Sequence, residues 1–254
     1  MFQLNNKIAI VTGGGSGIGK EVCKVLAKQG AHVIVVDLNA DSAKGTVDKI
    51  TANGNTAEAL TLDVTNQGAV TTAFEKLKSL DILVNCAGIS HIGSATSTNE
   101  TDFEKVFQVN VKGVYNCLQA GVNVMKKCGG GSIVNISSIA AKVGLSDRFA
   151  YSMSKGAVHA MTMSVAKDYI KDNIRCNSVS PGRVHTPFVD GFLKKNYPGQ
   201  EAEMFEKLSK TQPIGRMGLP IEVAHQVLYL CSEEAAFITG SDFSIDGGFI
   251  TLNS

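Results

Sequence analysis

Short apolar runs alternate with longer stretches of helical periodicity along this chain. The runs are rich in β-branched residues and are bounded by glycine and polar residues, which is typical of buried strands. Seven of them are predicted as strands: Ile8–Val11, Val33–Val36, Ala57–Leu62, Ile82–Val84, Ile133–Ile136, Cys176–Val179 and Phe243–Ile245. Apolar strands that alternate with helices form a parallel sheet covered on both faces. The pattern therefore predicts an α/β fold.

Helical stretches fill the intervals between the predicted strands. They begin near Gly17, Ala40, Gln67, Glu100, Ala150 and Ile221, and Gly30, Gly54 and Gly129 stand where helices should stop. Because no internal repeat, low-complexity tract or linker divides the chain, residues 1–254 are predicted to form a single domain.

One polar stretch interrupts this alternation, from Thr186 to about Pro220, and it carries several Lys and Glu residues. A segment of this length inside an α/β domain is usually a functional lid or a disordered loop. We predict a helical lid over the ligand at about residues 187–219, and a solvated insertion is the alternative.

The charge and the cysteine content narrow the class of function. With 24 Lys and Arg against 23 Asp and Glu, the formal net charge is +1, so no single-sign field attracts nucleic acid or an anionic membrane. No apolar run reaches the length of a membrane span, which is about eighteen residues. The first residues lack the charged and apolar regions of a signal peptide. We therefore expect a cytoplasmic protein with a small-molecule ligand.

The six cysteines form no CxxC pair or metal-type cluster, which indicates reduced thiols and no metal site.

A glycine-rich segment, Thr12–Gly19, joins the first strand to the first helix. Backbone amides at a helix N-terminus, left open by glycine, form a cradle for pyrophosphate. Gly13, Gly17 and Gly19 have the spacing G-x-x-x-G-x-G rather than the common dinucleotide pattern G-x-G-x-x-G. A nucleoside-triphosphate loop would need Ser or Thr where Glu21 stands. The segment therefore indicates a dinucleotide, the alternative being a tight turn with no ligand.

Asp37 ends the second predicted strand, about twenty residues after the glycines. A carboxylate in this position accepts hydrogen bonds from the adenosine ribose hydroxyls and repels a 2′-phosphate. No Arg or Lys lies among residues 13–19 to hold such a phosphate, and Ser16 occupies the most suitable position for one. The cofactor is therefore predicted to be NAD rather than NADP.

Tyr151 and Lys155 stand four residues apart, with Ser138 thirteen positions before the tyrosine. Residues i and i+4 share one face of a helix, so the lysine ammonium can lie next to the phenol. A nearby cation favours the ionised form of an acid, which would help Tyr151 to give and take a proton. A tyrosine four residues before a lysine is usually only a pair on the surface of a helix. We predict a catalytic role for this pair because the other motifs accompany it.

Together these segments resemble the short-chain dehydrogenase/reductase family, and the resemblance covers almost the whole chain. The motifs that carry it are Thr12–Gly19, Asp63-Val64, Asn85-Cys-Ala-Gly88, Asn110, Ser138, Tyr151-x-x-x-Lys155 and Pro181-Gly-x-Val-x-Thr186. The resemblance implies a Rossmann fold, a doubly wound seven-stranded parallel sheet with helices on both faces. One departure is visible, because many members have a second Asn where this chain has Cys86. The contacting backbone can be the same with either residue.

The resemblance also implies roles for individual residues. Tyr151 would be the general acid/base, Lys155 would assist it and hydrogen-bond the nicotinamide ribose, and Ser138 would hold the substrate oxygen. Asn110 would be the helix-kink residue that positions a water in a proton relay behind the lysine, although it could simply cap or kink a helix. Ser137 competes with Ser138 for the catalytic role. The implied cofactor-binding residues are Gly13, Ser16, Gly17, Ile18, Gly19, Asp37, Asp63, Val64, Asn85, Ala87, Gly88, Tyr151, Lys155, Pro181, Gly182, Val184 and Thr186.

Two arginines near the expected pocket bear on the substrate. Arg148 lies three residues before the tyrosine, and Arg183 lies in the turn beside the expected nicotinamide. A guanidinium there could clamp a carboxylate through two hydrogen bonds. This resembles the branch of the family that acts on short hydroxy acids and sugar-derived deoxy-keto acids. The alternative is that either arginine is a surface or structural ion-pair residue, and His91 and His185 are further polar candidates.

These inferences predict an NAD-dependent oxidoreductase that interconverts a secondary alcohol and a ketone on a sugar, a sugar acid or a short hydroxy acid. A 3-oxoacyl-[acyl-carrier-protein] reductase shares the catalytic set, but that branch usually takes NADPH through a basic residue that is absent here. A catalytically silent dinucleotide-binding sensor would be expected to lose Tyr151, Lys155 or Ser138 first. The resemblance also implies a homotetramer that pairs the helices at about 100–127 and 150–171, with a C-terminal contact near Phe249–Leu252.

Overall fold

Seven parallel strands form one sheet in the computed structural model, which describes residues 1–252, without the side chains of residues 195 and 196. The spatial order is β3-β2-β1-β4-β5-β6-β7. The strands are β1 (Ile8–Thr12), β2 (His32–Asp37), β3 (Ala57–Thr61), β4 (Ile82–Asn85), β5 (Gly131–Ile136), β6 (Ile174–Pro181) and β7 (Asp242–Ile245). The predicted α/β Rossmann fold is confirmed, and each of the seven predicted strands coincides with an observed one to within about two residues at either end.

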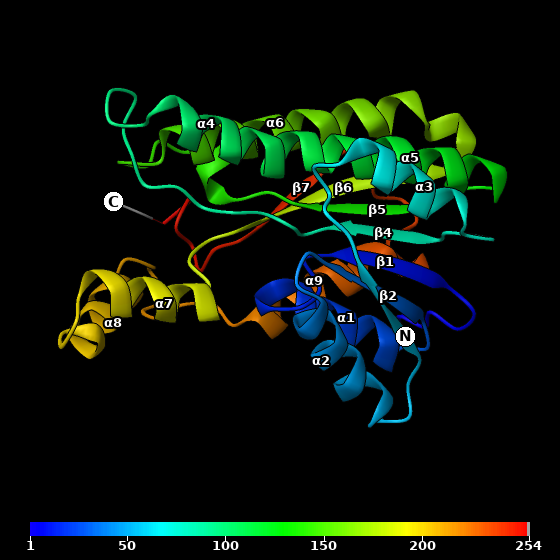
Figure 1. Cartoon of the computed structure of the whole chain (residues 1–254), viewed down its shortest axis with the longest axis horizontal. Helices are drawn as coiled ribbons and strands as arrows, with labels where there is room; N and C mark the ends of the chain where they lie inside the picture. Colours follow the sequence, from blue (N-terminus) through cyan, green and yellow to red (C-terminus); the bar gives the residue numbers. More distant parts are fainter. Residues whose placement is uncertain (253–254) are drawn as a thin grey trace.

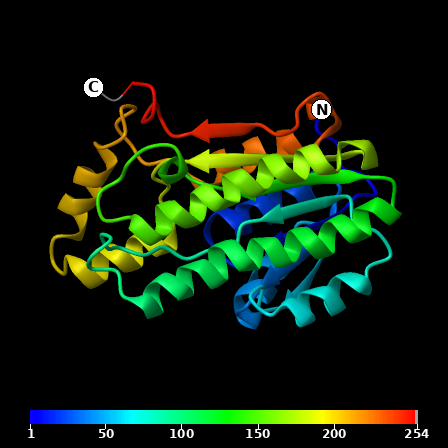
Figure 2. The ribbon, with the colours of Figure 1, turned by 90° about the horizontal axis from the view of Figure 1, so that it is seen from above.

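Helices cover both faces of the sheet (Figures 1 and 2). Their bounds are α1 (Gly17–Lys28), α2 (Ala40–Thr51), α3 (Gln67–Glu75), α4 (Glu100–Phe107), α5 (Gly113–Lys127), α6 (Phe149–Asp168), α7 (Pro187–Asn196), α8 (Glu201–Ser209) and α9 (Pro220–Cys231). Asparagine side chains cap the N-termini of α2, α3 and α4, each accepting a hydrogen bond from a first-turn amide. Short polar residues before each apolar stretch therefore fix where these helices begin.

The hydrophobic core has two layers, one on each side of the sheet. Ala9 and Val11 of β1 belong to the layer under α1 and α9, whereas Ile10 belongs to the layer under α3, α5 and α6. Alternate side chains of each strand point to opposite faces, so a strand covered on both faces must be apolar throughout. This is the reason that the central strands β1, β2, β4 and β5 contain continuous buried runs.

The chain order places a crevice at the carboxyl ends of the strands. From β1 the chain builds outward through β2 and β3, then returns to add β4 on the other side of β1. At such a switch point the connections after the two neighbouring strands leave in opposite directions, and ligands bind there in open α/β sheets. The Thr12–Gly19 segment follows β1 and therefore borders this crevice.

The polar segment at residues 187–219 contains α7 and α8, which lie beyond the carboxyl ends of the strands (Figure 1). Its returning end is joined to the turn after β6 by an isolated β-bridge between Val184 and Gly218. The segment is therefore helical, and its action as a lid stays a prediction. Within residues 1–252 no helix is both long and apolar enough to cross a membrane.

Candidate active site

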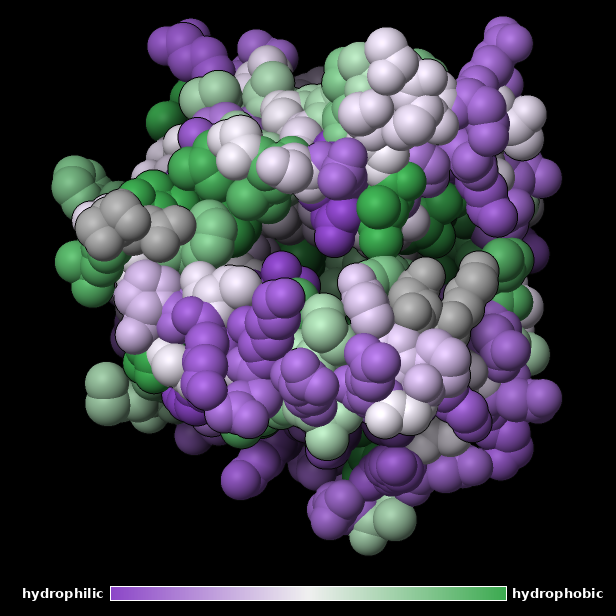
Figure 3. Space-filling view, turned by 90° about the vertical axis from the view of Figure 1, so that its left-hand side faces the viewer, coloured by the Kyte–Doolittle hydropathy of each residue, from purple (hydrophilic) through white to green (hydrophobic). Residues whose placement is uncertain are grey.

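A cavity of about 680 Å³ opens at the carboxyl ends of the strands. Figure 3 looks at this edge of the molecule and shows a hollow with hydrophobic residues on its walls and hydrophilic residues around it. The predicted site residues that line the cavity are Gly13, Ser16, Gly17, Ile18, Gly19, Asp37, Asp63, Val64, Ala87, Gly88, Ser138, Arg148, Tyr151, Lys155, Pro181, Gly182, Arg183, Val184 and Thr186. The fold thus brings together segments that are far apart in the sequence, within the size range of small-molecule sites.

The glycine loop packs so closely against its own backbone and the backbone of Ala87 that side chains at Gly13 and Gly19 would not fit. A Cβ on Gly19 would lie 2.2 Å from the carbonyl oxygen of Gly13, and a Cβ on Gly13 would lie 2.9 Å from the backbone of Ala87. Gly17 has a φ of +50°, in the left-handed region that glycine adopts at little cost. Ser16, at the N-cap of α1, makes no side-chain capping bond, and the first turn carries no acidic residue. The first amides of α1 therefore remain available to an anion, as a pyrophosphate cradle requires.

The side chain of Asp37 is held at the end of β2. Its Oδ2 accepts a hydrogen bond from the amide of Gly15 at 2.9 Å, and its Oδ1 accepts one from the amide of Asn39 at 3.0 Å. The carboxylate is thus fixed on the cavity wall beside the glycine loop. This is the placement needed to accept hydrogen bonds from ribose hydroxyls.

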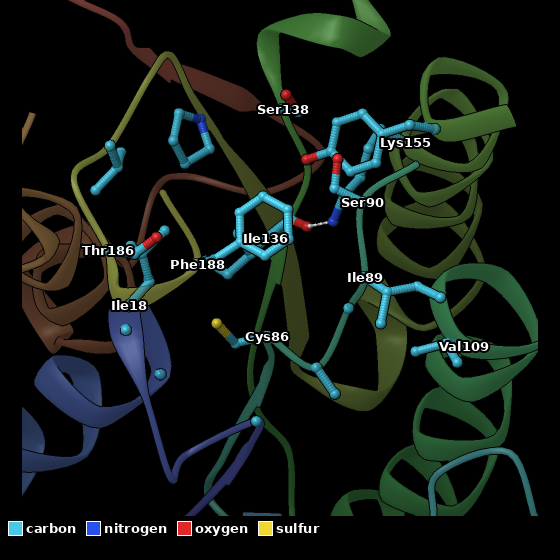
Figure 4. A pocket seen from close by; sticks show the side chains of 18 of the residues that line it. Ile18, Cys86, Ile89, Ser90, Val109, Ile136, Ser138, Lys155, Thr186 and Phe188 are labelled. Atoms are coloured by element: carbon cyan, nitrogen blue, oxygen red, sulfur yellow. Dashed lines mark hydrogen bonds between the residues drawn. The ribbon is translucent and has the colours of Figure 1, made fainter. Parts of the chain in front are cut away.

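Tyr151 and Lys155 lie one turn apart on α6. The Lys155 ammonium is 5.7 Å from the centroid of the Tyr151 ring, and it donates a 2.8 Å hydrogen bond to the carbonyl oxygen of Ile136. The lysine is only 7 % exposed, so its charge is little screened by solvent. Figure 4 shows this hydrogen bond at the end of β5, where the cavity wall is formed.

Two serines follow β5, and their hydrogen bonds distinguish them. The Ser137 hydroxyl donates its proton to the carbonyl oxygen of Lys155 at 3.2 Å. The Ser138 oxygen accepts from the amide of Ala140 at 3.1 Å, which leaves its own hydroxyl proton free to donate toward the cavity. The geometry therefore favours Ser138 as the group that binds a substrate oxygen.

Asn110 lies in a π-helical turn, Gln108–Lys112, between α4 and α5. Such single turns inside helices are frequent at functional sites. The Asn110 side chain is 1 % exposed, accepts from the amide of Ile89 at 2.8 Å, and donates to the carbonyl oxygen of Ile89 at 2.9 Å and to Ser154 Oγ at 3.0 Å. It joins the loop after β4 to α6 from behind the cavity wall, and its part in a proton relay stays a prediction.

The last residue of β4 is a predicted site residue that does not line the cavity. Asn85 is buried, and its Nδ2 donates to Asn135 Oδ1 at 2.8 Å inside the sheet. Cys86, the departure from the family pattern, points toward the cavity (Figure 4). Burial raises the pKa of the Cys86 thiol to about 11, so at neutral pH it is an uncharged group beside Lys155.

Arg148 and Arg183 line the same cavity, and no carboxylate among the described residues pairs with either. Arg148 donates to the carbonyl oxygen of Asp147, and the buried Nε of Arg183 has no hydrogen-bond partner. Burial and then the positive charge of Arg148 lower the pKa of Arg183 below its usual range. Two guanidiniums that no described carboxylate neutralises are therefore available to an anionic ligand.

The two candidate histidines have partners outside the cavity. His185 Nε2 lies 2.7 Å from Asp190 Oδ1, and His91 Nε2 lies 3.5 Å from Asp102 Oδ2.

The sequence interpretation missed several residues that do line the cavity, among them Phe188, Gln212 and Phe249. Nothing local in the sequence distinguishes these three, because their place depends on how the 187–219 segment and the C-terminal turn pack.

A family model described as enoyl-(acyl carrier protein) reductase matches residues 13–250. The chain belongs to the short-chain dehydrogenase/reductase family. The relatives described next are named dehydrogenases, and this short-chain dehydrogenase/reductase is an oxidoreductase of the class that acts on CH–OH groups.

Two relatives and one solved structure illustrate the range of substrates. The chain is 35% identical over 248 residues to 2-keto-3-deoxy-L-fuconate dehydrogenase of Xanthomonas campestris, covering 97% of this chain and 81% of the relative. It is 38% identical over 253 residues to cyclopentanol dehydrogenase of Comamonas, covering 98% of this chain and 99% of the relative. A structure from Agrobacterium tumefaciens, provisionally named a 2-deoxy-D-gluconate 3-dehydrogenase and holding NADP, matches with a TM-score of 0.89 at 28% identity over 98% of each chain.

These comparisons support a nicotinamide dinucleotide as the cofactor of this short-chain dehydrogenase/reductase. The glycine loop, the open first turn of α1 and the fixed carboxylate of Asp37 fit the pyrophosphate and ribose of such a molecule. The comparisons include both charged and uncharged substrates, so the choice among them depends on this chain's own residues.

Proposed function

We propose that this short-chain dehydrogenase/reductase uses NAD to interconvert a secondary alcohol and a ketone on a sugar, a sugar acid or a short hydroxy acid. The observation that carries the proposal is the convergence of Ser138, Tyr151 and Lys155 on the cavity that the glycine loop also lines. A sensor without catalysis would have no use for this arrangement.

In the direction of oxidation, Tyr151 would accept the hydroxyl proton of the alcohol. Ser138 would hydrogen-bond the same oxygen and orient it, and the Lys155 ammonium would stabilise the phenolate that receives the proton. A bound nicotinamide dinucleotide supplies the hydride acceptor for oxidation and the hydride donor for reduction. In reduction, Tyr151 would return the proton to the carbonyl oxygen.

Asp37 supports NAD rather than NADP, because its carboxylate would repel a 2′-phosphate and no basic residue lies in residues 13–19. We expect the wild-type enzyme to prefer NAD in parallel assays with both cofactors. Asp37→Asn keeps a side-chain acceptor and removes the charge, so the preference should fall roughly tenfold or more. Asp41→Asn, an exposed acid in the first turn of α2, is the matched control. A strong preference of the wild-type enzyme for NADPH would contradict the proposal and favour the 3-oxoacyl-[acyl-carrier-protein] reductase alternative.

We further propose that the substrate carries a carboxylate that Arg148 and Arg183 bind. The unpaired charges of the two arginines support this, as does the likeness to a dehydrogenase named for a keto acid. A screen of uronic, aldonic and deoxy sugar acids, free sugars and short hydroxy acids, followed by nicotinamide absorbance, would identify the substrate.

Arg183→Met should weaken binding of a carboxylate about tenfold to a hundredfold, because a hydrogen-bonded charge partner is lost. Two matched pairs of ligands isolate this effect: 3-hydroxybutanoate with butane-1,3-diol, and D-gluconate with D-glucitol. Each pair differs only in a carboxylate replaced by a hydroxymethyl group. The diol and the glucitol should bind the variant as they bind the wild-type enzyme, and an equal loss for both members of a pair would contradict the carboxylate site.

A homotetramer is also part of this proposal. Large apolar side chains are exposed on the outer face of the α4, α5 and α6 layer, namely Phe107, Tyr115, Phe149 and Met163. Pairing of these helices between subunits would cover them.

A further inference from the structure

Gln212 is a buried polar residue at the returning end of the 187–219 segment, and the proposed mechanism gives it no role. Its side chain is 2 % exposed and contributes to the cavity wall. Its Oε1 accepts a 3.2 Å hydrogen bond from the backbone amide of Arg183. A Cβ on Gly182 would lie 2.7 Å from the same oxygen, so the turn after β6 packs directly against this amide group.

Gln212 is itself anchored to the end of α8. Its Nε2 donates to Thr211 Oγ1 at 3.1 Å, and that hydroxyl donates to the carbonyl oxygen of Leu208 at 2.6 Å. The backbone amide of Gln212 donates to the carbonyl oxygen of Ser209 at 3.1 Å. Its side-chain oxygen is therefore held in place by the fold of the 187–219 segment, which contributes to the cavity wall.

Arg183 has free space on the side away from the main cavity. A second cavity of about 140 Å³ lies there, and both Arg183 and Gln212 line the two cavities. No hydrogen bond or ion pair among the described residues holds the Arg183 guanidinium, so its direction depends on its backbone and on the packing that buries its Nε. Gln212 fills part of the wall that separates the two spaces.

The remaining anchors of the turn do not depend on Gln212. The amide of Gly182 donates to the carbonyl oxygen of Ile245 at 3.0 Å, and the amide of Gly218 donates to the carbonyl oxygen of Arg183 at 2.9 Å. Val184 and Thr186, which follow the turn, should therefore keep their positions when the Gln212 side chain changes. Loss of its hydrogen bond would act mainly on Arg183.

We propose that Gln212 is a positioning residue that holds Arg183 toward the main cavity, so that the returning end of the 187–219 segment determines how the carboxylate is bound. This inference rests on the proposed carboxylate site. It adds that the arginine alone does not create that site, because the side-chain amide of Gln212 fixes the backbone from which the guanidinium extends.

The test measures ligand binding to the NADH-saturated enzyme by calorimetry, with the two matched ligand pairs named above. Gln212→Met has similar length and no acceptor, and it should weaken binding of 3-hydroxybutanoate and D-gluconate about fivefold to tenfold. Binding of butane-1,3-diol, D-glucitol and NADH should stay within about twofold, because the two side-chain hydrogen bonds that are lost link Gln212 to Arg183 and to Thr211 and not to these ligands. Gln200→Met, which changes an exposed glutamine before α8, is the matched control.

A second variant keeps the test valid if Gln212→Met folds poorly. Gln212→Glu retains an oxygen that can accept from the Arg183 amide and adds a negative charge beside the guanidinium. It should weaken binding of both carboxylates about tenfold or more and leave the uncharged ligands unchanged, since the new charge competes for Arg183.

The outcomes separate this inference from the proposed function. If Arg183→Met weakens carboxylate binding and Gln212→Met does not, the positioning role is overturned and the carboxylate site stands. Equal weakening of charged and uncharged ligands by Gln212→Met would also overturn it, because the residue would then serve the fold in general. If the wild-type enzyme binds both members of each pair equally, the carboxylate site itself fails and the inference fails with it.

Discussion

Replacement of Tyr151 by Phe is expected to lower kcat about a thousandfold while leaving dinucleotide binding nearly unchanged. The variant keeps the ring that lies 5.7 Å from the Lys155 ammonium and removes only the hydroxyl that would exchange a proton with the substrate. Positioned acid–base groups contribute roughly a hundredfold to ten-thousandfold to rate, and a thousandfold corresponds to about 4 kcal/mol of activation free energy. Turnover at saturating NAD and substrate, together with titration of NADH fluorescence, measures both quantities.

The chain offers a matched control for this substitution. Tyr169 lies at the other end of α6, and the Lys126 ammonium is 5.5 Å from its ring centroid, so the pair has nearly the same geometry outside the cavity. Tyr169→Phe should leave turnover unchanged. Full activity of Tyr151→Phe would mean that another group exchanges the proton.

Lys155→Met is expected to lower kcat about a thousandfold as well, and also to weaken dinucleotide binding about tenfold. Methionine has a similar length and can occupy the buried position, but it removes both the charge near Tyr151 and the hydrogen bond to the Ile136 carbonyl oxygen. The two variants thus differ in their cofactor affinity, because only the lysine is proposed to bind the nicotinamide ribose as well.

Lys126→Met is the matched control for the lysine, since it removes the cation near Tyr169. Equilibrium titration with NADH separates a cofactor effect from a rate effect. If Lys155→Met retained wild-type turnover, the ammonium would have no part in the proton exchange. If it lost turnover with unchanged NADH affinity, only its proposed ribose contact would be wrong.

The order of strands and helices could be predicted from the sequence because it depends on local features. Continuous β-branched runs such as Val33–Val36 can be buried on both faces only in a covered sheet, and Asn39, Asn66 and Asn99 mark helix starts through bonds to nearby amides. No local pattern in the sequence predicts the π-helical turn at Gln108–Lys112. Its extra residue is stabilised by the bonds from Asn110 to Ile89 and Ser154, which come from elsewhere in the chain.

The candidate site could be predicted from the sequence where the spacing within a short motif determines how its residues lie relative to one another. The glycines of residues 13–19 and the Tyr151–Lys155 spacing imply an anion cradle and a one-turn pair on any helix, and both line the cavity. Tertiary contacts decided the rest. They place Asn85 in a buried hydrogen bond to Asn135, and they give His91 and His185 acidic partners outside the cavity. They also give the hydroxyls of Ser137 and Ser138 different hydrogen bonds, so that only the proton of Ser138 remains free to donate toward the cavity.

By itself, the sequence determined the fold class, because this depends on periodicity. Its short motifs carried the resemblance to the family and marked the glycine loop and the Tyr151–Lys155 pair that is proposed to exchange the proton. Only the tertiary structure decided that Arg148 and Arg183 share one cavity with no counter-charge from the described residues, and that Gln212 accepts a hydrogen bond from the backbone of Arg183. The physical reason is that charge pairing and burial depend on which distant segments pack together. Residues 148, 183 and 212 have no fixed relation until the sheet and the 187–219 segment are assembled.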